Sequence, residues 1–401
     1  MLNVISAEKA RAVCATLPQK KLTTENISLC DCLGRTSAAD ISSAELVPPF
    51  DRSTVDGYAV CSRDTYGSSD SIPAMLNICG SITMGECTDL KINHGECVKI
   101  ATGGMLPKNA DSVVMLEYTS VTPDGFCLVY SPVAPFANIT KAGDDTRPGD
   151  LIVAKNTRLG ACQIGALAAA GKSEIQVVKK PLAGIISTGD ELVPVNSSQT
   201  PGKIRDVNTS LLSALCSYLG CSVKAYGIIP DKKDFLKNIV KKAAAECDIV
   251  LISGGSSAGE KDETVNIISE LGAVLAHGIA CKPGKPTVIG SVNSVPVLGL
   301  PGHPAAAYFV ANSLLRSLLP SVGITPPAVI KSDFPLSRNI SSNNGREEYI
   351  CVKIQDCEAV PYPAKSGIIS VLSSADGYIT IPASAEGAQK GETVTVNFFN
   401  L

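Results

Sequence analysis

Between about residues 178 and 322, short apolar runs alternate with segments of helical character, and this alternation constrains the fold more than any other feature. The apolar runs LAGIIS, VKAYGII, DIVLIS and VPVLGL are each followed by turn residues. Strands that alternate with helices in this way are typical of a parallel sheet with helices on both faces. We therefore predict a parallel α/β core domain over residues 178–325.

Four helices are predicted to cover this sheet. The first carries leucines at helical spacing, with Asn208 as its N-cap and Gly220 at its end. The second follows the PDKKD segment, and the third follows Asp262. The last runs from Ala305 to Leu319, because Pro304 suits the first turn of a helix and Pro320 stops it.

Acidic residues follow several of the predicted strands. Asp190 and Glu191 come after LAGIIST, Asp231 comes after VKAYGIIP, and Asp262 closes the loop after DIVLIS. The carboxyl ends of parallel strands share one edge of an open sheet, and ligands bind in the crevice there. These four carboxylates are therefore expected to face one pocket, although helix capping is the simpler interpretation of Asp231 taken alone.

The loop SGGSSAG, residues 253–259, is a candidate anion site. Glycine permits close approach of backbone N–H groups to a ligand, and the following helix N-terminus adds partial positive charge. The residues concerned are Ser253, Gly254, Gly255 and Ser256. An ordinary tight turn between a strand and a helix explains the same loop, so both interpretations stay open.

Lys282 and Lys285 lie on the proline-stiffened segment KPGKP. Two such cations could neutralise a phosphate or another oxyanion, although a lone pair of lysines is more typical of a solvated surface. A site that holds phosphate-binding groups and several acids usually needs a hard divalent cation. We expect Mg²⁺, which prefers oxygen ligands and bridges carboxylates to substrate phosphates.

The rest of the chain is predicted to form three further domains. Residues 45–141 contain short β-rich runs broken by Gly, Pro and Asp, which indicates an inserted β domain. The flanks 1–44 and 142–177 would form a discontinuous N-terminal domain, although two consecutive domains fit the composition equally well. Residues 326–401 alternate in the manner of a small β-barrel or sandwich. The predicted fold class is thus multidomain α/β plus β.

Composition excludes several functional classes. The net charge of −3 and the aromatic content of 4% argue against a nucleic-acid partner. There is no apolar run long enough to span a bilayer and no export signal, so we expect a cytoplasmic protein without a membrane partner. The fifteen cysteines form no CxxC pair and are mostly expected to be buried thiols.

Three loops outside the α/β segment carry polar residues that secondary-structure propensity does not explain. In PPFDRSTVDGYAV, the side chains that could take part in chemistry are those of Asp56 and Tyr58. The segment ATGGMLPKNAD is broken by Gly and Pro, and AGDDTRPGD places three acids around one arginine. Each of the three is also consistent with a simple turn.

These loops, together with STGDEL, GKIRDVN, SGGSSAGEKD, KPGKP and GLPGHP in this order, resemble the molybdopterin molybdenumtransferase (molybdenum insertase) family. Its eukaryotic relatives include the C-terminal region of gephyrin. The resemblance covers nearly the whole chain. It implies a homodimer whose subunits have the four domains described above, with the core domain related to molybdopterin adenylyltransferases and a C-terminal β-barrel.

The resemblance also implies a reaction and its residues. Adenylylated molybdopterin is bound, molybdate is delivered to its dithiolene, and Mg²⁺-assisted cleavage of the adenylate releases molybdenum cofactor and AMP. The implied catalytic acids are Asp56, Asp145, Glu191, Asp231 and Asp262, of which Glu191, Asp231 and Asp262 would hold the metal. The implied substrate-binding residues, beyond the glycine loop, are Thr102, Lys282, Lys285, Pro301, Pro304 and Ser366.

Asp56 and Asp145 are expected to reach the cleft from the partner subunit. Molybdopterin adenylyltransferase and molybdoenzyme-maturation proteins are the protein partners that the resemblance suggests. Two alternatives remain: a non-catalytic scaffold of the same fold, and an adenylyltransferase acting on molybdopterin. Retention of all five acids argues against the scaffold, and the large β segments are unexplained by an adenylyltransferase.

Overall fold

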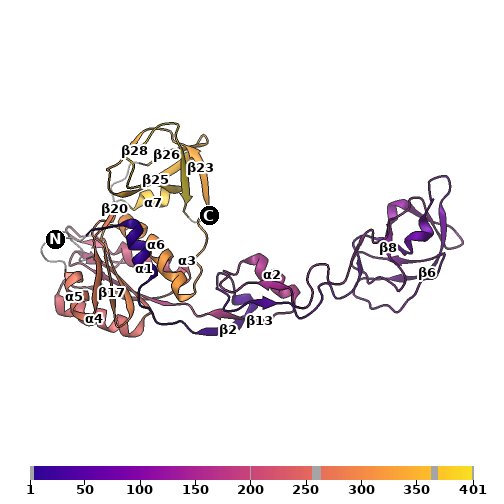
Figure 1. Ribbon diagram of the computed structural model, residues 1–401, viewed down its shortest axis with the longest axis horizontal. Coiled ribbons are helices and arrows are strands. Elements are labelled where there is room, and N and C mark those ends of the chain that lie inside the picture. Colours follow the sequence, from indigo (N-terminus) through magenta and orange to yellow (C-terminus); the bar gives the residue numbers. More distant parts are fainter. Residues whose placement is uncertain (1–3, 199, 255–262, 363–368, 400–401) are drawn as a thin grey trace. The chain divides into compact units, whose positions relative to one another are not determined.

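The computed structural model describes residues 4–198, 200–254, 263–362 and 369–399 (Figure 1). Contacts divide the chain into two compact units. The first comprises residues 1–39, 155–160 and 175–401, and the second comprises residues 40–154 and 161–174. The four-domain division of the sequence is finer than this and stays a prediction.

A six-stranded sheet of order β17-β14-β18-β22-β21-β19 is the centre of the first unit. Four neighbouring strands are parallel, as predicted. They are β17 (Ser222–Ile229), β14 (Leu182–Thr188), β18 (Ile249–Ser253) and β22 (Val295–Leu300). Two antiparallel strands extend the sheet beyond this prediction, namely β21 (Val288–Val292) and β19 (Ala273–His277).

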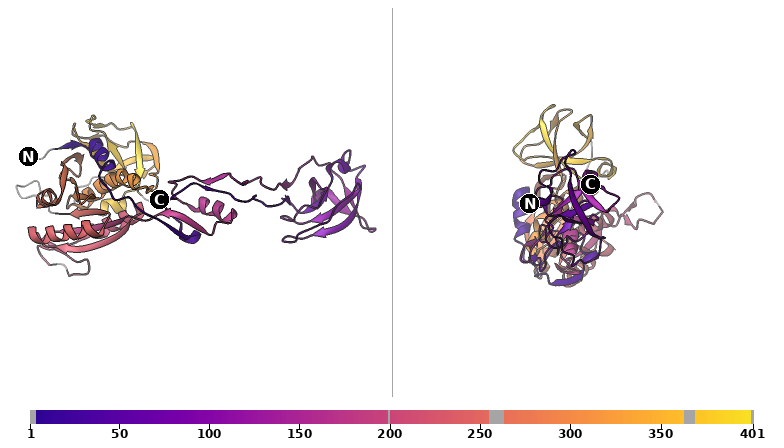
Figure 2. Two further views of the ribbon diagram at one scale, coloured as in Figure 1. Left: turned by 60° about the horizontal axis from the view of Figure 1, so that its bottom comes forward. Right: turned by 90° about the vertical axis from the view of Figure 1, so that its right-hand side faces the viewer.

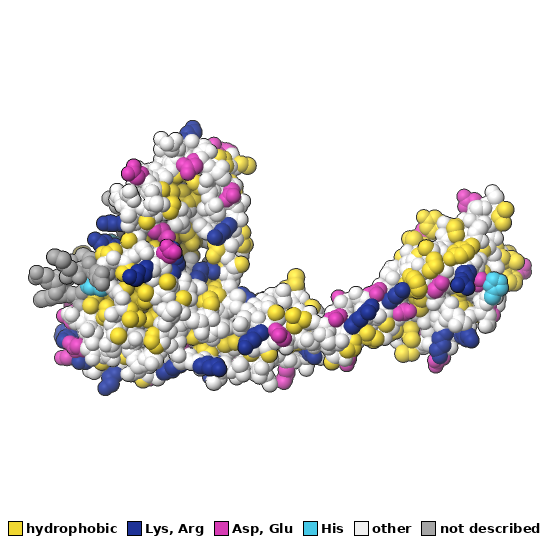
Figure 3. Space-filling model, viewed as in Figure 1, with side chains coloured by type: hydrophobic (Ala, Val, Ile, Leu, Met, Phe, Trp, Pro, Cys, Tyr) yellow, Lys and Arg dark blue, Asp and Glu magenta, His cyan; other side chains and the backbone are white. Residues whose placement is uncertain are grey.

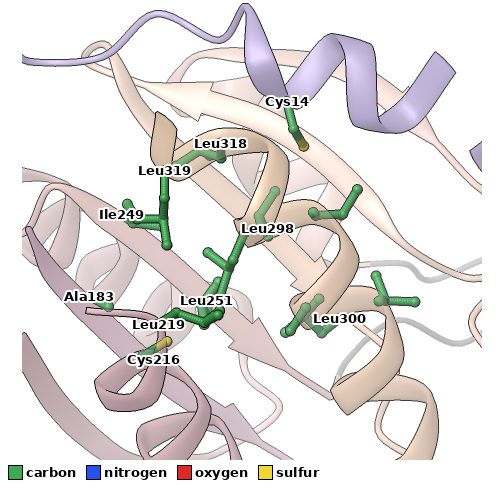
Figure 4. Close-up of a cluster of buried hydrophobic side chains, with 14 of the residues drawn as sticks. Cys14, Ala183, Cys216, Leu219, Ile249, Leu251, Leu298, Leu300, Leu318 and Leu319 are labelled. Carbon is green, nitrogen blue, oxygen red and sulfur yellow. The ribbon is translucent and has the colours of Figure 1, made fainter. Parts of the chain in front are cut away.

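Helices cover both faces of this sheet, and alternate residues of each strand face opposite cores. Ile185 and Leu251 belong to the core beneath α1 (Ala7–Ala15), α3 (Val207–Leu219) and α6 (Pro304–Leu318), part of which is drawn in Figure 4. Ile186 and Ile252 belong to the core beneath α4 (Lys233–Glu246) and α5 (Glu263–Leu271). This period of two is what a strand buried on both faces requires.

Two predicted helix starts differ from the structure. The N-cap of α3 is Asp206, whose side chain accepts a hydrogen bond from Thr209 N, and Asn208 lies inside the helix instead. The N-cap of α4 is Lys232, without a side-chain hydrogen bond, so Asp231 caps no helix. The end of α3 is as predicted, because Gly220 takes the left-handed conformation with φ of 104°.

The C-terminal segment forms a sheet that includes strands from elsewhere in the chain. Its order is β1-β20-β25-β27-β29-β23, with β26 added to β25. β1 (Ile5–Ser6) and β20 (Ile279–Lys282) pair with each other, and β20 pairs in parallel with β25 (Glu347–Gln355). The remaining strands are β23 (Lys331–Pro335), β26 (Glu358–Pro361), β27 (Gly377–Ile381) and β29 (Thr393–Phe398).

The second unit contains a six-stranded sheet of order β8-β5-β7-β6-β10-β9 (Figure 2). Two hydrophobic clusters stabilise it, and Tyr58 and Ala59 of β5 belong to different ones. No helix was predicted for residues 45–141, and only short 3₁₀ turns occur there. The strands are β5 (Gly57–Val60), β6 (Ala74–Ile82), β7 (Glu96–Ile100), β8 (Ser112–Met115), β9 (Thr119–Val121) and β10 (Phe126–Val129).

Short elements complete the fold. Residues Ala161–Ala169 form the short helix α2. A two-residue pair, β15 (Leu192–Val193) with β16 (Ile204–Arg205), follows the end of β14. The other two-stranded pairs are β2 (Thr24–Ser28) with β13 (Glu174–Val178), β3 (Ile41–Ser42) with β12 (Leu151–Val153), β4 (Arg52–Ser53) with β11 (Ile139–Thr140), and β24 (Ile340–Ser341) with β28 (Gly387–Ala388).

Acidic and basic side chains are interspersed on the face of each unit seen in Figure 3. All fifteen cysteines are free and most are buried, as predicted. Across the described residues, the helices lack the length and apolar character that a membrane crossing demands.

Candidate functional site

The ends of β14, β17, β18 and β22 surround a cleft of about 1230 Å³, which we call the carboxylate cleft. The prediction that acids following separate strands meet at one sheet edge is confirmed for Glu191 and Asp231, which both line it. The other lining residues include the cations Lys203, Arg205 and Lys232, and also Thr188, Asp206, Asn208, Ser253, Gly254, Glu263, Pro301, Gly302, His303 and Pro304. The volume exceeds what a drug-sized ligand needs.

Asp231 is held by the neighbouring strand end. The Thr188 hydroxyl at the end of β14 donates a hydrogen bond to Asp231 Oδ1. The backbone N–H of Asp231 donates to Asp190 Oδ1 at 3.2 Å. Asp190 thus fixes the backbone of Asp231. The prediction that Asp190 itself faces the cleft is wrong, because it is not among the lining residues.

Gly254 is required by the close approach of two strands. Its φ is 99°, a conformation that residues with a Cβ rarely adopt. A Cβ at this position would lie 2.0 Å from the carbonyl oxygen of Thr188. The first glycine of the predicted anion loop therefore lets β18 and β14 end side by side. Gly255, Ser256 and Asp262 lie outside the described residues.

Helix α3 forms another wall of the carboxylate cleft. Asp206 accepts hydrogen bonds from the hydroxyl of Ser187 on β14 and from Thr209 at its own helix N-terminus. Asn208 Nδ2 donates to Ser253 Oγ at 2.6 Å and to the Gly302 carbonyl at 2.7 Å. The predicted site residues did not include either side chain, although both belong to the GKIRDVN motif.

Glu263 is a further cleft residue that the sequence analysis missed. It is the first residue of α5, and its Oε2 is buried without a hydrogen-bond partner in the part of the chain that is described. A signal was present, because Glu263 directly follows Asp262 at a helix N-terminus, where negative charge is favourable. The carboxylate is available to a cation or to a donor of the ligand.

The carboxylates fit a loosely held Mg²⁺ better than a closed metal cage. Among the described residues, no group of three His, Cys, Asp or Glu side chains is arranged to hold a metal ion. Glu191, Asp231 and Glu263 nevertheless offer oxygen ligands to one cleft. Mg²⁺ commonly binds one or two carboxylates and keeps several waters, so this donor set suits it.

The two predicted lysines lie in a second cleft of about 750 Å³, which we call the lysine cleft. Lys282 Nζ forms an ion pair with Glu348 Oε1 at 2.7 Å, and Ser342 donates a hydrogen bond to the other oxygen of the carboxylate. Arg338 and Arg346 also line this cleft and were not predicted. Lys282 and Lys285 are therefore not an isolated pair of solvated lysines. They lie on a surface with two further arginines, where Glu348 neutralises part of the positive charge.

The two clefts share a wall. Pro286, Pro301 and His303 line both of them. The predicted substrate-binding residues Pro301 and Pro304 flank the turn between β22 and α6. The sequence predicted one pocket for acids and lysines, whereas the structure has two adjoining clefts. Ser366, another predicted substrate-binding residue, lies outside the described residues.

In the second unit, Asp56 and Thr102 form one local site. Asp56 Oδ1 accepts hydrogen bonds from the backbone N–H of Thr102 at 2.7 Å and from its hydroxyl at 2.9 Å. These two bonds lower the pKa of the exposed Asp56 carboxyl. Asp145 is also exposed, and its backbone N–H donates to the Val47 carbonyl.

Tyr58 was wrongly singled out as a chemically active side chain. It is 3% exposed and belongs to a hydrophobic cluster of the six-stranded sheet. Burial raises the pKa of its phenol, which disfavours ionisation. β5 is buried on both faces, so Tyr58 lies inside, and the short loop sequence did not reveal a buried strand.

Family models match three consecutive stretches of the chain. Residues 5–171 match the MoeA N-terminal region (domain I and II), residues 184–321 match a probable molybdopterin binding domain, and residues 333–399 match the MoeA C-terminal region (domain IV). Together these matches run along almost the whole chain, in the order that the sequence motifs predicted.

Individual relatives agree with these matches. A molybdopterin biosynthesis protein of Methanocaldococcus jannaschii is 37% identical, with 93% of this chain and 91% of the relative covered. The molybdopterin molybdenumtransferase of Bacillus subtilis is 33% identical, with 97% and 92% covered. A crystal structure of the molybdopterin biosynthesis moeA protein of Pyrococcus horikoshii has a TM-score of 0.82 at 38% identity, and covers 99% of this chain and 100% of that one. The chain belongs to the molybdopterin molybdenumtransferase family.

Proposed function

We propose that this protein is a molybdenum insertase: it binds adenylylated molybdopterin, transfers molybdenum from molybdate to the molybdopterin, and releases AMP. The observation that carries this proposal is the carboxylate cleft, in which Glu191 and Asp231 lie together in a chain whose relatives are named molybdopterin molybdenumtransferases. The enzyme is thus a transferase of molybdenum, with molybdopterin and molybdate as substrates.

The two clefts would bind chemically different parts of the substrates. The turn of Pro301 to Pro304 and the Gly254 end of β18 shape the wall against which a pterin or a nucleotide lies. Lys282 and Lys285, with Arg338 and Arg346, supply positive charge for an oxyanion such as molybdate. Because the clefts share Pro286 and His303, an anion in the lysine cleft would lie beside a ligand in the carboxylate cleft.

Glu191 and Asp231 would hold Mg²⁺, and Asp262 would complete the set. When bound, Mg²⁺ neutralises phosphate charge and so assists cleavage of the adenylate. Thr188 fixes the orientation of the Asp231 carboxylate through its hydroxyl. The buried oxygen of Glu263 can accept a proton or a hydrogen bond at the same cleft.

The test is the reaction itself. Purified protein is incubated with adenylylated molybdopterin, molybdate and Mg²⁺, and AMP is measured by chromatography. We expect AMP and molybdenum cofactor to appear together, and both to stop when EDTA removes the metal. A folded protein that bound the substrate but released no AMP would favour the scaffold alternative, and formation of the adenylate from molybdopterin and ATP would favour an adenylyltransferase.

We further propose that the protein is a homodimer in which Asp56, Thr102 and Asp145 serve the cleft of the partner. Asp56 is suited to this role because it is exposed and its ionised form is stabilised by Thr102. Mixing two inactive variants, Asp56→Asn and Asp231→Asn, tests the sharing. Subunit exchange would restore about one quarter of the activity, because half of the dimers are mixed and each has one intact site. No recovery after verified exchange would place all acids of a site on one subunit.

A further inference from the structure

Asn208 is a buried polar residue that neither the helix nor the hydrophobic core requires. It lies one residue inside α3 and is 7% exposed. Helix α3 already has Asp206 as its N-cap, so the amide of Asn208 does not satisfy the helix end. A buried amide is tolerated only where its donors and acceptors find partners. The position of these partners therefore indicates what the residue does.

Both donors of the Asn208 amide reach strand ends that line the carboxylate cleft. Nδ2 donates to Ser253 Oγ at 2.6 Å, at the end of β18, and to the Gly302 carbonyl at 2.7 Å, in the turn after β22. A carbonyl oxygen accepts and does not donate, so the nitrogen of the amide must face Gly302. Asn208 thus connects three separate chain segments at the sheet edge.

The other half of the amide is unused. Asn208 Oδ1 is buried and has no hydrogen-bond partner within the described part of the chain. A buried unpaired acceptor destabilises a protein, and a well-packed apolar residue of the same size avoids that penalty. Asparagine is therefore not the choice that core packing alone favours. The two hydrogen bonds to Ser253 and Gly302 account for its presence.

We propose that Asn208 is a positioning residue for substrate binding. It fixes the spacing between the Ser253–Gly254 end of β18 and the Pro301–Pro304 turn, which are two walls of the carboxylate cleft. Loss of the amide would leave the two walls joined only through the pairing of β18 with β22, which ends at Ser253 and Leu300, and bound substrate would be held less tightly. The assignment rests on the proposed function for its kinetic measurement only.

The test compares Asn208→Leu with a matched control, Asn312→Leu. Asn312 is also a buried helical asparagine, 6% exposed, but it accepts a hydrogen bond from Arg316 on α6 and does not line the carboxylate cleft. We expect Asn208→Leu to raise KM for adenylylated molybdopterin at least tenfold with a Tm within a few degrees of the wild type. The control should keep KM within twofold, even where its Tm falls.

Direct binding separates this inference from the proposed function. Affinities for AMP and for molybdopterin are measured by calorimetry, without turnover. We expect Asn208→Leu to weaken at least one of them tenfold, and this result stands even if the wild type proves inactive in insertion. If Asn208→Leu does not fold, Asn208→Ser provides the same comparison, because the shorter serine side chain cannot reach both Ser253 and Gly302. Affinities and KM within twofold of the wild type in the folded variant would overturn the assignment.

Discussion

The carboxylate cleft and the lysine cleft adjoin but compensate their charges differently. In the lysine cleft, the protein itself supplies the counter-charge, because Lys282 pairs with Glu348. In the carboxylate cleft, Asp231 accepts a hydrogen bond from the neutral Thr188 hydroxyl. Among the ion pairs within the described residues, none includes Glu191 or Asp231.

This difference indicates at which carboxylates an added cation would have the larger effect. Lys203, Arg205 and Lys232 also line the carboxylate cleft, but because none of the described ion pairs includes Glu191 or Asp231, these two carboxylates are where the proposed Mg²⁺ would add most attraction for a phosphorylated ligand. In the lysine cleft, an anion that binds Lys282 must displace Glu348 or share the lysine with it. Four predictions test this contrast, in decreasing order of the expected effect.

Asp231→Asn should lower the rate of AMP release by about 100-fold, since loss of a positioned charge at a reacting centre has effects of this size. The Thr188 hydroxyl can still donate to the amide oxygen, so the fold should be unchanged. AMP release at saturating Mg²⁺ measures the effect. Asp234→Asn is the control, because Asp234 is exposed on α4 and does not line the cleft. Equal rates for both variants would remove Asp231 from the site.

Gly254→Ala should destabilise the protein by about 2–3 kcal/mol, because its Cβ would overlap the Thr188 carbonyl and its φ is unfavourable for alanine. Chemical denaturation measures the loss. Gly302→Ala is the matched control: among the described residues, a Cβ there would meet only Gly254 Cα, at 3.9 Å. If the two variants were equally stable, the proposed close approach of β18 and β14 would be wrong.

Glu348→Gln should tighten molybdate binding about threefold to tenfold, equivalent to ~0.7–1.4 kcal/mol. Removal of the carboxylate leaves the positive charge of Lys282 uncompensated, so an anion gains attraction. The gain should shrink at high salt, because Lys282 is half exposed and its charge is screened. Calorimetric titration with molybdate at two ionic strengths checks both points. Weaker binding by Glu348→Gln would mean that Glu348 mainly orients Lys282.

Thr102→Val should raise the pKa of Asp56 toward its ordinary value, because one of the two hydrogen bonds to the carboxylate is lost. In the wild type the lowered pKa favours the ionised form. Its contribution to stability is therefore present above the ordinary pKa and is lost as the pH falls through the lower, folded-state pKa. NMR titration of the Asp56 carboxyl measures the change, and Thr54→Val is the control. An unchanged pKa would assign the shift to the backbone N–H alone.

Much of the site could be predicted because its signals are local. Strand runs followed by acids predicted the shared edge for Glu191 and Asp231, and the glycine at position 254 indicated a close approach. Helix periodicity predicted α3, but it did not distinguish Asp206 from Asn208 as the cap, since both residue types cap helices.

Contacts between distant segments were not predictable in this way. Glu348 lies 66 positions after Lys282, and only the parallel pairing of β20 with β25 brings them together. Likewise, the partners of Asn208 depend on where β18 and β22 end in the sheet. A single sequence contains no local pattern for such pairs, because their register is set by tertiary packing.

The pairing of β20 with β25 also has a consequence for the order in which the protein matures. Lys282 lies opposite Glu348, on a strand that the ribosome produces about 65 residues later. A nascent chain that ends before residue 347 can already close the α/β sheet, but it exposes the bare edge of β20. The lysine cleft is thus completed only after the α/β sheet, and a chain cut short there would keep Glu191 and Asp231 while lacking Glu348, the ion-pair partner of Lys282.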